Sequence, residues 1–108
     1  MKYKPAIVAA FFLEVGLPIP QFELAHIPGR KFRLDVAWPN PGGGGGVGIE
    51  VNGGVWSRGA HGRGKGIVRD YEKNNLALLT GWRILQILPA DLCTLETATM
   101  VLNLRLLK

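Results

Sequence analysis

Two acidic side chains, those of Asp35 and Glu50, stand in neighbouring segments that have the sequence pattern of β-strands. Polar and apolar residues alternate over 31–37, and the segment 47–51 is rich in β-branched residues. Adjacent strands lie about 4.8 Å apart, so carboxylates on two of them can share one cation. Such hard oxygen ligands suit Mg²⁺, which keeps several waters and takes one or two carboxylates together with a substrate phosphate. A metal ion bound there would polarise a phosphodiester and activate water for in-line attack.

The pair by itself is weak evidence, because acidic residues at this separation are common and two exposed strand residues need not meet. The residues after Glu50 strengthen it. Gly53 and Gly54 leave backbone room for a phosphate, and a basic, glycine-rich segment follows over 58–66. Such a segment can bend round a nucleic-acid backbone, with arginine gripping phosphate through a bidentate fork, although a solvated loop is the alternative. The candidate DNA contacts in and around it are Arg30, Arg33, Arg58, His61, Arg63, Lys65 and Arg69.

The elements that must position these residues follow from periodicity and from the glycines and prolines at their ends. Helices are predicted over 4–15 and 67–80, strands over 21–27, 31–37, 47–51 and 82–88, and a last helix from its cap at Asp91. The segment 39–46 is expected to be a flexible loop. The apolar sides expected for the three helices are Ile7, Val8, Phe11 and Phe12; Ile67, Tyr71, Leu78 and Leu79; and Leu92, Leu95, Thr99, Leu102 and Leu106. The order α-β-β-β-α-β-α predicts an α/β domain with a small mixed β-sheet flanked by helices.

Composition limits the partners and the surroundings of the chain. A chain of 108 residues is expected to be a single domain over 1–108, and 47% hydrophobic residues are too many for a disordered chain. No apolar stretch approaches the roughly 20 residues that span a bilayer, so no membrane association is expected. Thirteen Lys plus Arg against eight Asp plus Glu give a net charge of +5, which favours a polyanion such as nucleic acid as partner. The single Cys93 excludes a disulfide within the chain and fits a reducing cytoplasm.

Five motifs together carry a family resemblance. They are Glu23-x6-Arg30-x2-Arg33-Leu34-Asp35-Val36-Ala37-Trp38-Pro39, Ile49-Glu50-Val51-Asn52-Gly53-Gly54-Val55-Trp56-Ser57, His61-x-Arg63-Gly64, Asp70-x-Glu72-Lys73-x-Asn75 and Leu79-x-Gly81-Trp82-Arg83-Ile84-Leu85. With them the chain resembles a phage and prophage group of PD-(D/E)XK endonucleases. That group is similar to very-short-patch-repair nucleases and to archaeal-type Holliday junction resolvases. The resemblance implies a restriction-endonuclease-like fold, Mg²⁺-dependent DNA cleavage with Mn²⁺ as a substitute, and a phage protein in the cytoplasm of a bacterial host.

The resemblance also implies roles for acidic residues in the site. Asp35 corresponds to the motif aspartate and Glu50 to the motif glutamate, which hold the metal ion. Resolvase-like members carry a further glutamate in the first helix, and here that would be Glu14. Glu23, on the strand before the motif aspartate, is the competing choice and matches the spacing of the phage group. A surface ion pair remains the alternative for either residue.

The basic residue of the motif is where the chain departs from the family pattern. A strict E-x-K motif would place lysine where this chain has Asn52, which can orient water but brings no charge to offset developing negative charge. In related groups the basic residue comes from the following helix, and Lys73 fits that role, with Lys65 and Arg69 as alternatives. His61 is a candidate general base or phosphate contact, or a plain loop histidine.

The function expected from these observations is cleavage of branched DNA, such as a four-way junction, by a homodimer. Symmetric cutting of two strands requires two-fold symmetry, and the leucines of the last helix are one candidate interface, although packing within the monomer is the alternative. Two other hypotheses stay open. One is a non-catalytic DNA-binding module on a decayed nuclease fold, which Asn52 favours and the intact Asp35 and Glu50 oppose. The other is a mismatch-nicking or homing-type endonuclease.

Overall fold

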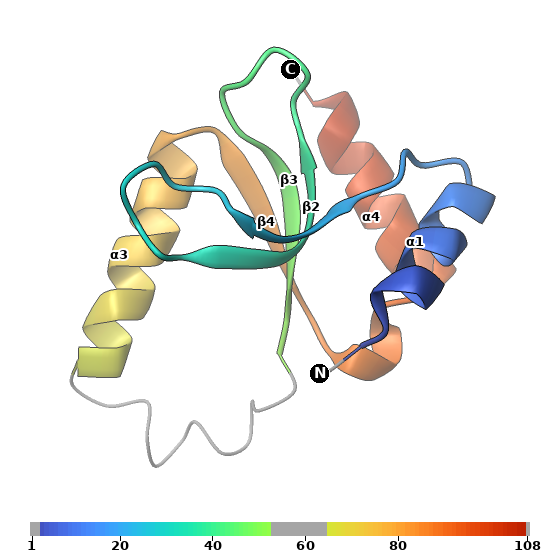
Figure 1. Ribbon diagram of the computed structural model, residues 1–108, viewed down its shortest axis with the longest axis horizontal. Coiled ribbons are helices and arrows are strands. Elements are labelled where there is room, and N and C mark those ends of the chain that lie inside the picture. Colours follow the sequence, from blue (N-terminus) through green and yellow to red (C-terminus); the bar gives the residue numbers. More distant parts are fainter. Residues whose placement is uncertain (1–2, 53–64, 108) are drawn as a thin grey trace.

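The computed structural model describes residues 3–52 and 65–107, and their side chains except those of 65–67. Its elements along the chain are α1 (Pro5–Glu14), β1 (Gln21–Ala25), β2 (Arg33–Pro39), β3 (Gly46–Val51), α3 (Lys65–Leu79), β4 (Trp82–Ile87), a 3-10 turn η1 (Pro89–Asp91) and α4 (Leu95–Leu106). Within these ranges the chain is a small mixed α/β domain with a four-stranded mixed sheet and three helices (Figure 1). The prediction of a small mixed sheet flanked by helices is confirmed. None of the described helices is both long and apolar enough to span a bilayer.

The sheet has the order β1-β2-β3-β4. The first three strands pair antiparallel, and β4 then pairs parallel to β3 after the chain has passed through α3. A parallel pair needs such a crossover, because a tight turn can join only antiparallel strands. The register sets Val36 opposite Ile49, and Glu50 opposite Gln86. Asp35 on β2 and Glu50 on β3 therefore lie on the two central strands of the sheet, with β1 and β4 at its edges.

Each face of the sheet packs against its own helices, as Figure 1 shows with α1 and α4 together on one side and α3 on the other. On the first face Phe12 and Trp38 meet edge to face with ring centroids 4.9 Å apart, and Val101 of α4 is fully buried against the same cluster. On the second face Ala77 of α3 packs with Leu34 and other residues of a separate cluster. Strand residues alternate between the two faces, so β3 directs its valines and isoleucine to α1 and α4 and presents Glu50 towards α3.

The glycine run before β3 is more ordered than the predicted flexible loop. The Asn40 N–H donates to the Gly45 carbonyl at 2.8 Å, and the Gly46 N–H donates to the Gly81 carbonyl at 3.3 Å. Gly45 and Gly81 have φ values of +98° and +87°, and a Cβ on either would collide with the backbone of the other segment. Only glycine accommodates both the positive φ and this close approach. The run therefore closes the β2–β3 connection against the start of β4.

The predicted start of the last helix was wrong. Asp91 ends the 3-10 turn, and α4 begins at Leu95 with Thr94 as its N-cap, whose hydroxyl accepts from the Thr97 N–H at 3.2 Å. The Asp91 carbonyl accepts hydroxyl hydrogen bonds from Thr94 and Thr97 instead. Asp91 and Thr94 are both good N-cap residues. Because Pro89–Asp91 forms a separate 3-10 turn, the α-helix starts later and Thr94 is its cap.

The expected helix faces were also wrong in part. In α4 the buried side chains are Thr97, Ala98 and Val101, whereas the leucines at 95, 102 and 106 and Thr99 are exposed. In α3 Ala77 is buried, and the predicted Tyr71, Leu78 and Leu79 are exposed. In α1 Val8 and Phe12 are buried while Ile7 is 58% exposed. Apolar residues surround α1 and α4 on nearly all sides, so periodicity cannot select the packed face.

Candidate functional site

Asp35 and Glu50 meet across the β2–β3 pair. The β2–β3 pairing extends to Val36 opposite Ile49, and Asp35 and Glu50 are the next residues on the two strands. The Val51 N–H donates to Asp35 Oδ2 at 2.7 Å, so the Asp35 carboxylate lies against the peptide that directly follows Glu50. Both acidic residues are partly buried. The two residues expected to share a cation are thus brought together by strand pairing and by a hydrogen bond.

Lys73 completes this group from the other side. Its position on α3 places the ammonium over the sheet, where Nζ forms an ion pair with Glu50 Oε1. Their side chains are only 19% and 15% exposed, so solvent screens this pair less than it screens a surface pair. Gln86, the β4 neighbour of Glu50, donates from Nε2 to Glu50 Oε2 at 3.3 Å. Both carboxylate oxygens of Glu50 therefore have partners, and its orientation is held by α3 and β4 together.

Asn52, directly after β3, joins the same network. Its Nδ2 donates to Gln86 Oε1, and Gln86 in turn donates to Glu50. Asn52 thus acts on Glu50 through Gln86, whereas Lys73 contacts Glu50 directly. The positive charge that position 52 does not carry reaches the glutamate from α3.

Glu23 and Glu14, the two candidates for a further acidic residue, lie in different places. Glu23 lies between residues that pair with Val36 and Leu34, so it stands beside Asp35 on β1, with a φ of +51°. Glu14 is exposed in the last turn of α1. Tyr3, which contacts Asp35, lies just before the first residue of α1, whereas Glu14 is the last residue of that helix. A helix rises about 1.5 Å per residue, so the two ends of α1 are roughly 14 Å apart along its axis. Glu23 is therefore the closer of the two to Asp35, and its side chain is also exposed.

Tyr3 is a residue of the site that the sequence analysis missed. Its hydroxyl donates to the Asp35 backbone carbonyl at 3.0 Å. Burial and, to a smaller extent, the negative charges of Asp35 and Glu23 together raise the pKa of Tyr3 to about 12. The residue therefore stays a neutral hydrogen-bond donor and fixes the backbone at Asp35. A tyrosine 32 residues before its partner gives no motif spacing that could have revealed this contact.

His26, directly after β1, was also missed. It is 6% exposed, it packs edge to face on Trp82 at 5.6 Å, and neither ring nitrogen makes a hydrogen bond of normal geometry with the described residues. Burial is the main cause that lowers the pKa of His26, and the positive charge of Lys73 lowers it as well. The Leu24 backbone and the negative charge of Glu50 act in the opposite direction and raise it, but by less. The ring is thus a neutral group within the electrostatic reach of the Lys73–Glu50 pair. Its contact with Trp82, which begins β4, places it there.

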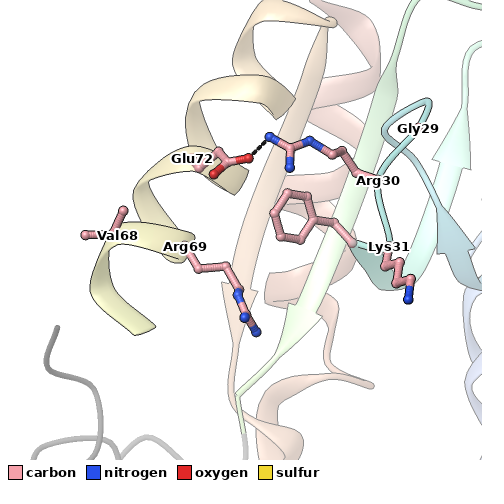
Figure 2. Close-up of a pocket in the computed structure, with 7 residues that line it drawn as sticks. Gly29, Arg30, Lys31, Val68, Arg69 and Glu72 are labelled. Atoms are coloured by element: carbon pink, nitrogen blue, oxygen red, sulfur yellow. Dashed lines mark ion pairs between the residues drawn. The ribbon is translucent and has the colours of Figure 1, made fainter. Parts of the chain in front are cut away.

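The predicted DNA contacts divide into two groups. Arg58, His61, Arg63 and the Lys65 side chain lie outside the described residues. Arg33 is exposed and donates to the Glu23 carbonyl at 3.2 Å. Arg30 and Arg69 line a hollow of about 700 Å³ between α3 and the chain that precedes β2 (Figure 2).

The donor set fits a metal ion that keeps most of its own waters. Within residues 3–52 and 65–107, apart from the side chains of 65–67, no group of three or more His, Cys, Asp and Glu residues is placed to hold a metal ion. A site built by protein ligands alone is therefore not formed by these residues. Two carboxylates, Asp35 and Glu50, are what Mg²⁺ uses when waters and a substrate phosphate complete its shell, and Mn²⁺ accepts the same oxygen ligands.

Comparisons of the chain with protein-family models, with curated proteins and with solved structures found no match. A function for this site therefore has to follow from its own residues and geometry.

Proposed function

We propose that the chain is a Mg²⁺-dependent endonuclease that hydrolyses DNA phosphodiester bonds. The observation that carries the proposal is the convergence of Asp35, Glu50 and Lys73, from two paired strands and a helix, at one point of the sheet. The mixed sheet with β4 parallel to β3, and the acidic residues on its central strands, support a restriction-endonuclease-like fold.

In this proposal Asp35 and Glu50 would hold the metal ion. When bound, Mg²⁺ supplies polarisation of the scissile phosphate and an activated water. The Lys73 ammonium offsets the negative charge that develops on the phosphate and orients the attacking water. Gln86 and Asn52 hold the Glu50 carboxylate in place, and Tyr3 holds the backbone at Asp35.

Branched DNA cut by a homodimer is the substrate and assembly that we propose for this nuclease. Symmetric incision of a four-way junction needs two copies of the site related by a two-fold axis. Leu95, Leu102 and Leu106 of α4 are 69%, 45% and 69% exposed, so the monomer core leaves them available for a second copy. The net charge of +5 supports a DNA partner. Mismatch nicking and homing-type cleavage use the same chemistry and differ in the DNA that the protein selects.

A non-catalytic DNA-binding module is the second candidate, and Asn52 in place of the motif lysine favours it. The Lys73–Glu50 pair supports the enzyme instead, because it supplies the charge that Asn52 lacks. The two candidates make different predictions about cleavage, not about binding.

The deciding experiment incubates the protein with a labelled four-way junction and Mg²⁺. We expect paired incisions near the crossover, and loss of cleavage in Asp35→Asn and Glu50→Gln. Glu96→Gln is the matched control, because Glu96 is an exposed acidic residue in the first turn of α4. Binding without cleavage by the wild type would rule out the enzyme. Cleavage that survives both substitutions would rule out the site. Equal cutting of a linear duplex would rule out the selectivity for junctions but not the nuclease activity or its site.

A further inference from the structure

A charged hollow lies beside the site, between the N-terminal half of α3 and the chain that leads into β2 (Figure 2). Its volume of about 700 Å³ lies within the range of roughly 300–1,000 Å³ that is usual for small-ligand pockets. The residues that line it are Gly29, Arg30, Lys31, Phe32, Val68, Arg69 and Glu72.

The hollow is basic and has an organised wall. Arg30, Lys31 and Arg69 against Glu72 leave three positive charges and one negative, a net of +2. Arg30 forms an ion pair with Glu72, drawn as the dashed line in Figure 2, and its guanidinium lies over the Phe32 ring at 5.8 Å. Arg30 and Phe32 therefore form one preorganised surface. Within the described residues, no carboxylate pairs with Lys31 or Arg69.

Cations beside an aromatic face are the chemistry that recognises a nucleotide. Lys31 and Arg69 suit a phosphate, and the Phe32 ring with the Arg30 guanidinium suits a stacked base. In a continuous duplex the bases are stacked on one another and cannot reach such a surface. A base becomes available only where it leaves the stack, as at a bulge, a flap, a nick or a branch.

The position of the hollow ties it to the cleavage site. Arg69 is one helical turn before Lys73 on α3, and side chains four residues apart on a helix have Cβ atoms about 5–6 Å apart. Lys73 contacts Glu50. A nucleotide in the hollow would therefore be a near neighbour, along the same strand, of a phosphodiester held at Asp35 and Glu50.

We infer that this hollow binds one unstacked nucleotide of a DNA strand, with its phosphate at Lys31 and Arg69 and its base against Phe32 and Arg30. The inference rests on the proposed nuclease function and names what that nuclease selects. A distorted or branched strand fills the hollow and a regular duplex does not. Selectivity for DNA structure then resides within one subunit and needs no base sequence.

The test measures binding of two duplexes by fluorescence anisotropy, with EDTA present so that no DNA is cut. The duplexes share one sequence, and one of them carries a single extra 2-aminopurine nucleotide as a bulge. We expect the bulged duplex to bind about tenfold more tightly, the usual scale of one base–aromatic stack, and its 2-aminopurine emission to be quenched. Phe32→Leu and Arg69→Gln should remove the preference. Arg105→Gln, the same kind of change in the last turn of α4, should leave it intact.

Equal affinity of the wild type for the two duplexes overturns the inference, and so does a preference that survives in both hollow variants. Because Phe32 packs partly into the core, thermal unfolding checks that Phe32→Leu folds; if it does not, the variant Arg69→Gln, at an exposed residue, decides.

Deoxyadenosine monophosphate serves as a competitor in a further measurement. If it displaces the bulged duplex at micromolar concentration, the hollow is a site for free nucleotides instead. Cleavage of the same DNAs in Mg²⁺ is measured in parallel. Bulge preference without any cleavage overturns only the nuclease, and cleavage without bulge preference overturns only the hollow.

Discussion

Lys73 supplies the positive charge at Glu50, and its replacement tests the chemistry that we assign to the site. Lys73→Gln should slow single-turnover cleavage by about 100-fold, the usual cost of losing one charge-stabilising group, while DNA affinity changes little. The rate is measured by quenched flow or gel assay and the affinity by anisotropy. Lys4→Gln, at the exposed residue before α1, is the control.

Asn52→Lys in the Lys73→Gln background gives a sharper result. A lysine at position 52 would stand two residues after Glu50, directly beyond the end of β3. We expect it to restore part of the rate, because either lysine would deliver an ammonium to the same metal and phosphate. An unchanged rate in Lys73→Gln itself would show that the ion pair is structural and has no part in cleavage.

Tyr3 leads to a prediction at high pH. Its pKa is about 12 in the folded chain and about 10 when it is exposed in the unfolded chain. The unfolded chain therefore loses its proton first, so the stability contributed by Tyr3 is present below pH 10 and is lost as the pH rises through 12. Tyr3→Phe removes this dependence. It also removes the hydrogen bond to Asp35, at a cost of about 1 kcal/mol.

The measurement is urea unfolding of both proteins from pH 8 to pH 11. The wild type should be the more stable at pH 8, and the difference should shrink above pH 10. A difference that stays constant would show that Tyr3 ionises equally in the folded and unfolded chains. A difference that grows would contradict the sign of the shift.

At the scale of elements, a close contact between glycines holds the β2–β3 connection against Gly81, the residue before β4. Gly45→Ala should destabilise the fold by about 2 kcal/mol or more, because a Cβ would meet Gly81 and the φ of +98° disfavours any side chain. Gly42→Ala is a close control in the same run, since nothing lies within 4 Å of its Cβ and its φ is not positive. Urea midpoints compare the two, and equal values would mean that the contact can relax without cost.

The elements also show how far the sequence could predict this structure. The strands were located well, because alternation and β-branched residues mark β2 and β3 directly. That same pairing makes Asp35 and Glu50 neighbours, so this part of the site was predictable. The faces of α1 and α4 were not, because leucine, alanine and valine occur all round both helices and the choice depends on how they pack.

The remaining site residues depend on contacts that are distant in sequence. Tyr3 reaches Asp35 from the start of the chain, and His26, directly after β1, packs on Trp82 at the start of β4. Neither residue belongs to a local motif. Lys73 was predictable only through the family resemblance, since nothing in its immediate sequence shows that its ammonium reaches Glu50.

At the scale of the whole molecule, the two faces of the sheet carry different kinds of residues. The α3 face holds Lys73, Glu50, His26 and the basic hollow, while the α1 and α4 face holds the larger hydrophobic cluster and several exposed leucines. A DNA strand would approach the first face. A second copy of the chain would then have the other face available, so that dimerisation and DNA binding need not compete for one surface.

This division predicts that the proposed dimer can be separated from the chemistry. Leu102 is 45% exposed on α4 and lines a small groove with Leu95 and Leu17, so Leu102→Glu would place a charge in the proposed interface. We expect the wild type to be dimeric by light scattering at micromolar concentration and Leu102→Glu to be monomeric. Leu79→Glu, at an 81% exposed leucine on α3, is the control and should stay dimeric. The monomer should still nick DNA, because every residue of the site comes from one chain, but it should lose the paired incisions. A monomeric wild type that makes paired incisions would contradict the dimer and leave the site intact.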